Sequence, residues 1–141
     1  MFVLDTDTVS HTQYAGSATG RRVASRIATA SEPVAVTMVT FAEQMRGRLA
    51  SCAAARTPEE YIEGLAQLRR LVESYRERMI LDFDDAAAAA FKKLKAAKIR
   101  VGTMDLRIAS IALVRDATVV TANVSDFRRV PGLKVEDWTA A

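Results

Sequence analysis

The sequence predicts an α/β fold in which helices flank a mainly parallel central sheet. Two observations lead to this prediction: short apolar segments recur along the whole chain, and longer segments of helical character separate them. A third observation is the length of 141 residues, which is enough for one core and too short for two ordinary domains. We therefore expect residues 1–141 to form a single domain.

The apolar segments have the length and composition of short buried strands. The expected strands are residues 2–4, 34–36, 79–81, 118–120 and 133–135. Because helical segments intervene between them, the strands are expected to pair in parallel through helical crossovers.

The intervals between the strands contain helix start signals. Thr40 and Glu43 have the spacing of a capping box, and so do Thr57 and Glu60, where proline follows the threonine at the first helical position. The second start predicts a helix over about 58–77. Apolar residues recur along it at intervals of three and four, namely Ile62, Leu65, Leu68, Leu71 and Val72.

Two further helices are expected in the second half of the chain. Asp84 is suited to cap an alanine-rich helix that runs toward Lys98, since alanine is the best helix former. The next helix is expected over about 104–116. Asp82 and Asp84 are therefore assigned structural roles.

Composition excludes several classes of protein. The chain is 50% hydrophobic and 26% charged, a balance typical of globular proteins and not of disordered or rod-like ones. It has no apolar run long enough for a membrane span and no basic segment preceding an apolar one, so we expect a cytoplasmic protein. Cys52 is the single cysteine, which excludes an internal disulfide and a cysteine-rich metal site. The net charge of +3 is too mild to establish nucleic-acid binding.

Acidic residues follow the expected strands. Asp5 ends the first strand, Glu43 lies in the helix after the second, and Asp105 lies at the start of a later helix. Asn123 and Asp126 follow the fourth strand. Because the carboxyl ends of parallel strands meet at one edge of a sheet, where ligands bind, we expect these side chains to converge there.

Carboxylates that converge repel one another unless they share a cation. Hard oxygen ligands without a neighbouring set of Cys or His favour Mg²⁺ or Mn²⁺ over zinc. A structural alternative stays open for Glu43 and Asp105, because acids near a helix start commonly act as caps or dipole partners. Asp5 needs a partner in any case, since it ends a buried strand. His11 and Cys52 are expected to be structural, as an exposed or turn residue and a small buried side chain.

Several segments together resemble PIN domains, specifically the toxin ribonucleases of the VapC family from bacterial toxin–antitoxin pairs. The segments are residues 3–7, 39–43 with 46–47, 102–109, 121–127, 130–133 and 136–138. They occur in the family's order and spacing and extend over nearly the whole chain.

This resemblance implies a ribonuclease that uses Mg²⁺, or Mn²⁺ in its place, to hydrolyse RNA phosphodiester bonds and leaves a 3′-hydroxyl and a 5′-phosphate. It also implies a homodimer, inhibition by a cognate antitoxin, and DNA contact only through that antitoxin. Asp5, Glu43 and Asp105 match the acidic metal-site positions, and Thr6 and Thr121 match supporting polar positions. Asn123 stands where a fourth acid is common, and Asp126 is a candidate replacement for it; both are counted among the catalytic candidates.

Two other functions stay open on the sequence. The first is a non-catalytic PIN-like module that binds RNA or protein, since Asn123 replaces an acid. The second is a phosphatase that uses Asp5 and Asp7 as nucleophile and acid, although it leaves Glu43 unexplained. Arginines near the expected site are candidate RNA-backbone contacts or solvated surface residues, namely Arg46, Arg107 and Arg128.

Overall fold

The computed structural model describes residues 1–14 and 16–141 and contains a five-stranded sheet. Its strands are β1 (Phe2–Leu4), β2 (Val34–Thr37), β3 (Met79–Leu81), β4 (Thr118–Val120) and β5 (Lys134–Glu136). The order across the sheet is β3-β2-β1-β4-β5, and every neighbouring pair is parallel. The fold class predicted from the sequence is confirmed, and only β5 begins one residue later than expected.

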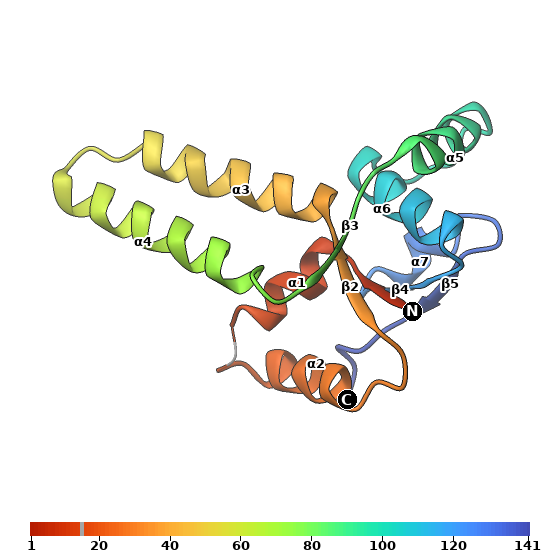
Figure 1. Cartoon of the computed structure of the whole chain (residues 1–141), viewed down its shortest axis with the longest axis horizontal. Coiled ribbons are helices and arrows are strands. Elements are labelled where there is room, and N and C mark those ends of the chain that lie inside the picture. Colours follow the sequence, from red (N-terminus) through yellow and green to blue (C-terminus); the bar gives the residue numbers. More distant parts are fainter. Residues whose placement is uncertain (15) are drawn as a thin grey trace.

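Helices cover both faces of this sheet. They are α1 (Thr6–Thr12), α2 (Ala18–Ala28), α3 (Met38–Ala53), α4 (Pro58–Ser74), α5 (Asp85–Ala96), α6 (Thr103–Val114) and α7 (Val124–Phe127). In Figure 1, α1 and α2 lie on one side of the strands and α5 and α6 on the other. Two apolar cores result, one on each side of the sheet.

Alternation along the strands divides the apolar side chains between the two cores, because successive strand residues point to opposite faces. Val3 and Val119 pack in the core beneath α5 and α6. Their neighbours Leu4 and Val120 pack in the other core, together with Trp138 near the C-terminus. The central strands β1 and β4 are therefore buried on both faces, as expected for a parallel sheet.

The helix starts agree with the sequence in two cases and differ in one. Thr57 caps α4 by accepting a hydrogen bond from the Glu60 amide at 3.1 Å, and Asp84 caps α5 in the same way. The prediction that Thr40 begins a helix is wrong. Thr37 is the cap, and its Oγ1 accepts a hydrogen bond from the Thr40 amide at 3.1 Å. Consequently Glu43 lies in the second turn of α3 and is not a capping-box residue.

Three short helices were not expected from the sequence, namely α1, α2 and α7. Helix α1 is capped by Asp5, and α2 by Ser17, whose Oγ accepts from the Gly20 amide at 2.9 Å. Gly20 permits a close approach between these helices, because a Cβ there would lie 2.5 Å from the Tyr14 carbonyl oxygen. Glycine is thus required at the start of α2.

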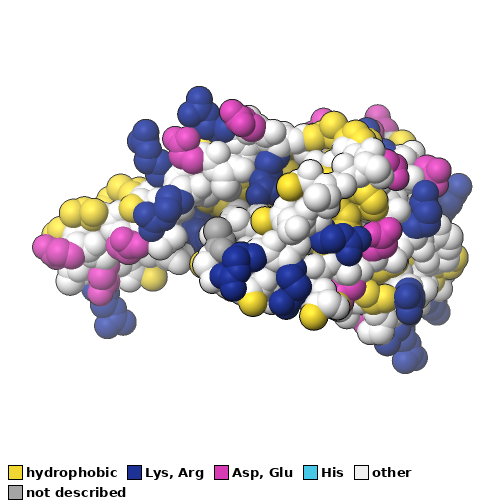
Figure 2. All heavy atoms as spheres, turned by 90° about the horizontal axis from the view of Figure 1, so that it is seen from below, with side chains coloured by type: hydrophobic (Ala, Val, Ile, Leu, Met, Phe, Trp, Pro, Cys, Tyr) yellow, Lys and Arg dark blue, Asp and Glu magenta, His cyan; other side chains and the backbone are white. Residues whose placement is uncertain are grey.

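Helices α3 and α4 form a hairpin that projects from the rest of the molecule (Figure 1). Of the apolar residues expected along one face of α4, those near the tip of the hairpin are not buried. Leu71 is buried in the core, whereas Ile62 is 68% exposed and Leu65 and Val72 are also exposed. Figure 2 shows yellow hydrophobic side chains between charged ones at this projecting end.

Of two single residues with expected structural roles, one agrees with expectation and one differs. Cys52 is buried in α3, as expected of a small side chain. His11 lies in the last turn of α1 and is partly buried, so it is a helical residue and not a turn residue. Within the described ranges, no helix is long and apolar enough to cross a bilayer.

Candidate active site

Asp5 is fixed in place at the centre of the carboxyl edge of the sheet. It follows β1 directly, is 3% exposed, and its Oδ1 accepts a hydrogen bond from the Thr8 amide at 2.9 Å. Its Oδ2 accepts from the hydroxyl of Thr121, the residue after β4, at 2.5 Å. The buried carboxylate therefore has the partners that its position at the end of β1 requires.

A chain of threonine hydroxyls connects the start of α1 to the start of α3. The Thr6 hydroxyl lies 3.0 Å from that of Thr40, and Thr40 in turn lies 3.4 Å from that of Thr37. Thr6 also donates to Glu43 Oε2 at 3.3 Å. Because Thr37 and Thr40 are fully buried, the network orients Thr6 and Glu43 rigidly.

Asp105 reaches the same edge from the first turn of α6. The N-cap of this helix is Gly102, which has no side chain to cap it, so the helix start is open toward the cavity. A cavity of about 350 Å³ lies there, lined by Asp5, Thr6, Asp7, Glu43, Gly102, Thr103, Met104 and Asp105. Carboxylates from three distant segments thus face one open cavity.

The electrostatics of this cavity are dominated by like charges. Burial raises the pKa of Asp5, although its hydrogen bonds with Thr121 and Thr8 oppose that shift. The pKa of Asp105 rises to about 6, first because of burial and then because of the charges on Asp5 and Asp7, with smaller contributions from Glu43 and Asp126. The cavity therefore favours the binding of a cation or a proton.

Asn123 and Asp126 lie beside this cavity and do not line it. Asn123 is exposed and its side-chain amide donates to Asp126 Oδ2 at 2.8 Å. Asp126 also forms an ion pair with Arg129 at 3.1 Å. Among the described residues, α7 has no side-chain cap, so Asp126 does not cap this short helix. The negative charge of Asp126 affects the site by raising the pKa of Asp105.

The donor set of the cavity fits a hard divalent cation better than a soft one. All its charged groups are carboxylates, with threonine hydroxyls beside them. Within residues 1–14 and 16–141, no three Asp, Glu, His or Cys side chains lie close enough together to enclose one ion. This arrangement suits Mg²⁺, which keeps several water ligands and is commonly held by one or two carboxylates and substrate phosphate.

The cavity is also lined by Asp7, which the sequence suggested only as the acid of a phosphatase, and by the segment 102–104, which it did not select as a site. Asp7 lies in the first turn of α1. Because this helix is short and mostly polar, the spacing of apolar residues does not predict it. The signal for Asp7 was its position two residues after Asp5. Of the candidate arginines, Arg46 and Arg128 are exposed, whereas Arg107 lies over the Phe91 ring, 5.6 Å from its centroid.

Comparison with known proteins decides the family. The family model of the PIN domain matches residues 2–133. The chain belongs to the PIN domain family. The resemblance to VapC proteins noted in the sequence is also confirmed. A relative from Salmonella typhimurium, "tRNA(fMet)-specific endonuclease VapC", is 39% identical over 83 residues, or 54% of this chain. The chain spans 63% of that relative's length, and less of two others.

Solved structures of PIN toxins in complexes agree with the fold over almost their whole length. A DNA-bound VapBC from Salmonella typhimurium superposes with a TM-score of 0.73 at 29% identity, covering 97% of each chain. VapBC-5 from Mycobacterium tuberculosis, a member of the VapBC family of toxin–antitoxin systems, is 31% identical with a TM-score of 0.57. That match covers 96% of this chain and 94% of the other.

Proposed function

We propose that this PIN domain is a Mg²⁺-dependent endoribonuclease and the toxin of a toxin–antitoxin pair. The observation that carries the proposal is the convergence of Asp5, Asp7, Glu43 and Asp105 on one open cavity at the carboxyl edge of the sheet. The names of the relatives, an endonuclease and a ribonuclease, support the same activity. An RNA phosphate is a substrate that such a cavity accommodates once a cation offsets the carboxylate charge.

Asp5, Asp105 and Glu43 are the residues that would hold the ion, one or two of them directly and the rest through its water ligands, and Mn²⁺ would be accepted in place of Mg²⁺. When bound, such an ion lowers the pKa of a water molecule and offsets charge on the phosphate. Thr121 and the Thr8 amide keep the Asp5 carboxylate in one orientation.

Thr6 would orient Glu43, since it donates to that carboxylate and is itself positioned by Thr40. Glu43 is then suited to accept a proton from the attacking water at the rim of the cavity. Hydrolysis at this site would leave a 3′-hydroxyl and a 5′-phosphate. Asn123 would add an uncharged oxygen near the site, and Asp126 a charge that Arg129 partly offsets.

The proposed partners are an RNA substrate, a second copy of the chain and a cognate antitoxin that blocks the site. Titles of the related structures name toxin–antitoxin complexes, some of them with DNA, which supports DNA contact through the antitoxin. The exposed apolar residues of the α3–α4 hairpin give the homodimer an apolar surface to bury. The cytoplasmic location stays a prediction.

The test is cleavage of single-stranded and looped RNA by the purified chain with Mg²⁺, with Mn²⁺ and with a chelator. We expect cleavage with either ion and none with the chelator. Asp5→Asn and Asp105→Asn should each lower kcat/KM by about a hundredfold or more, because each removes a charge that holds the ion. Asp82→Asn, which removes an exposed acid that does not line the cavity, is the matched control and should cleave like the parent.

The same assay separates the alternatives. A non-catalytic binding module would retain RNA without cutting it under any metal condition. A phosphatase would hydrolyse a small phosphate ester and leave RNA intact. A phosphatase that uses Asp5 and Asp7 would leave Glu43 and Asp105, which line the same cavity, without a role. Equal cleavage by the parent and both Asn variants would refute the proposed site.

A further inference from the structure

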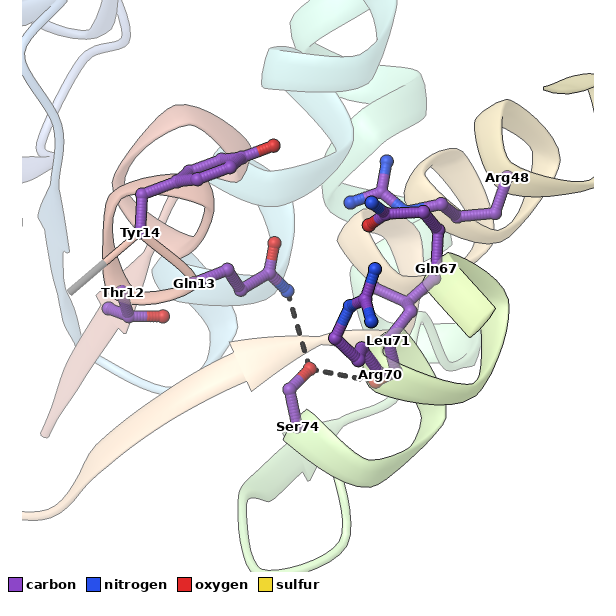
Figure 3. Close-up of a pocket in the computed structure, with 8 residues that line it drawn as sticks. All are labelled: Thr12, Gln13, Tyr14, Arg48, Gln67, Arg70, Leu71 and Ser74. Atoms are coloured by element: carbon purple, nitrogen blue, oxygen red, sulfur yellow. Dashed lines mark hydrogen bonds between the residues drawn. The ribbon is translucent and has the colours of Figure 1, made fainter. Parts of the chain in front are cut away.

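A second cavity lies between the end of α1 and the α3–α4 hairpin. Its volume is about 140 Å³, which is several times the roughly 30 Å³ that a water molecule takes up in the liquid. Figure 3 shows that Arg48, Gln67 and Arg70 extend from the hairpin toward Gln13, which follows α1. The lining is thus rich in hydrogen-bond donors and is distinct from the acidic cavity.

Arg48 is the unusual member of this lining. Its Nε is buried and, within the described ranges, has no hydrogen-bond partner. A buried donor without an acceptor is destabilising, and a guanidinium carries several donors arranged to hold an oxyanion in a bidentate manner. The side chain is only partly buried overall, so a ligand can reach it from the cavity.

The charge around the cavity is positive. Arg78 lies behind it and donates to Thr12 Oγ1 at 2.6 Å and to the Ser74 carbonyl oxygen at 2.9 Å. In the part of the chain that the structure describes, neither Arg48 nor Arg78 forms an ion pair with a carboxylate. Arg70 does, with Glu63 at 3.1 Å, and both of those side chains are exposed. The cavity therefore favours an anion.

The position of the cavity indicates which anion. Helix α1 starts at the acidic cavity with Asp5 as its cap and ends beside Gln13. On α3, Arg48 lies five residues beyond Glu43, a rise of about 7.5 Å along a helix. Helix α1 has seven residues and so spans about 10 Å. Because successive phosphates of a stacked strand are about 3.4 Å apart along its axis, these lengths correspond to about two to three nucleotide steps.

We propose that this cavity binds a phosphate of the RNA strand, about two to three nucleotides from the bond to be cleaved, with Arg48 as its charged donor. The inference rests on the proposed ribonuclease function. A substrate held there has one phosphate at the arginine while another enters the acidic cavity, where carboxylates repel it. By binding a nearby phosphate of the same RNA strand, the arginine thus offsets part of that repulsion.

The test compares Arg48→Gln with Arg69→Gln, which removes the same charge from an exposed position on α4 outside the cavity. With Mg²⁺ and a short single-stranded RNA, Arg48→Gln should raise KM about tenfold and leave kcat nearly unchanged. In an Asp105→Asn background that does not cleave, it should lower the slope of log Kd against log salt by about 0.7, the value for one phosphate of a single strand. Arg69→Gln should do neither.

Two additional arms make the result independent of folding and of activity. Arg48→Lys keeps the charge, so it should keep the salt slope while raising KM, because a lysine cannot bind a phosphate in a bidentate manner. An RNA whose linkages are made neutral one at a time, as methylphosphonates, should bind the parent less well when the neutral linkage is the one that occupies this cavity. That penalty should disappear with Arg48→Gln.

Three outcomes would overturn the inference. If Arg48→Gln matches Arg69→Gln in KM and salt slope while the parent cleaves RNA, the cavity is not a phosphate site and the proposed function stands. If Arg48→Gln leaves RNA constants unchanged but weakens the antitoxin complex, the cavity binds a carboxylate of a protein partner. If the parent neither binds nor cleaves RNA, the proposed function fails and this inference fails with it.

Discussion

At the carboxyl edge of the sheet, polar and charged side chains are buried, whereas on the α3–α4 hairpin large apolar side chains are exposed. Asp5 and Thr121 lie at the carboxyl ends of the adjacent strands β1 and β4, and Thr121 donates a hydrogen bond that the buried carboxylate needs. Ile62 and Tyr61 project into solvent without a covering element of this chain among the described residues. The edge of the sheet therefore suits the proposed cation, and the hairpin suits the proposed protein partner.

The largest effect is expected at the base of the hairpin. Leu71→Ala removes a side chain that is buried in the core with Tyr75, and should lower the free energy of unfolding by about 2–5 kcal/mol. Ile62→Ala on the same helix should change it by less than about 0.5 kcal/mol in a monomer. Urea denaturation measures both. If Ile62→Ala is as costly as Leu71→Ala, and more so at high protein concentration, the exposed face is covered by a second copy.

At the sheet edge, Thr121→Val tests the buried hydrogen bond. The variant keeps the shape of the side chain but leaves Asp5 Oδ2 without its donor, so the free energy of unfolding should fall by about 1–3 kcal/mol at neutral pH. Thr121→Ser keeps the hydroxyl and should lose much less. Equal losses in the two variants would assign the cost to the missing methyl group and not to the hydrogen bond.

Asp105→Asn should instead stabilise the metal-free protein at neutral pH. The pKa of Asp105 rises from 3.8 to about 6 on folding, so its charged form disfavours the folded state at pH values above that range. The Tm of the variant should exceed that of the parent at about pH 7, and the difference should disappear below about pH 4, where both are neutral. Thermal melts in a chelator measure it. A parent that melts higher than the variant at neutral pH would contradict the repulsion.

The smallest effects are expected at Asn123 and Asp126. Asp126→Asn should hardly change cleavage, because its carboxylate is held by Asn123 and by Arg129 outside the cavity lining. Asn123→Asp should tighten Mg²⁺ binding modestly, since it adds a charge near the site. Titration of cleavage rate with Mg²⁺ distinguishes them. If Asp126→Asn lowered the cleavage rate as much as Asp105→Asn does, the Asp126 side chain would have to point into the site.

The sequence predicted the sheet well because buried parallel strands are short, continuous apolar runs. It also located Asp5, since an acid that ends such a run must have a partner. The start of α3 was ambiguous for a physical reason. Thr37 and Thr40 both have cap-forming side chains, and only the burial of Thr40 against Thr6 decides between them.

Other features could not be predicted because they depend on segments that are far apart in sequence. Helices α1 and α2 carry little apolar periodicity, and the cap of α1 is a residue that the site also uses. Nothing in the spacing of Asn123 and Asp126 indicates that they bond to each other beside the cavity. The unpartnered Nε of Arg48 depends on α1, α3 and α4 meeting at one place.

The central position of β1 affects how the chain acquires its site during synthesis. β1 pairs with β2 and with β4, and the bond between Asp5 and Thr121 joins residues 116 positions apart. Contacts of such long sequence separation form late, because the entropy of closing the loop must be overcome first. A ribosome that has made the chain only as far as α6 therefore carries Asp5, Glu43 and Asp105 without the strand whose Thr121 orients Asp5. Until β4 emerges, the proposed nuclease site of the nascent chain is incomplete.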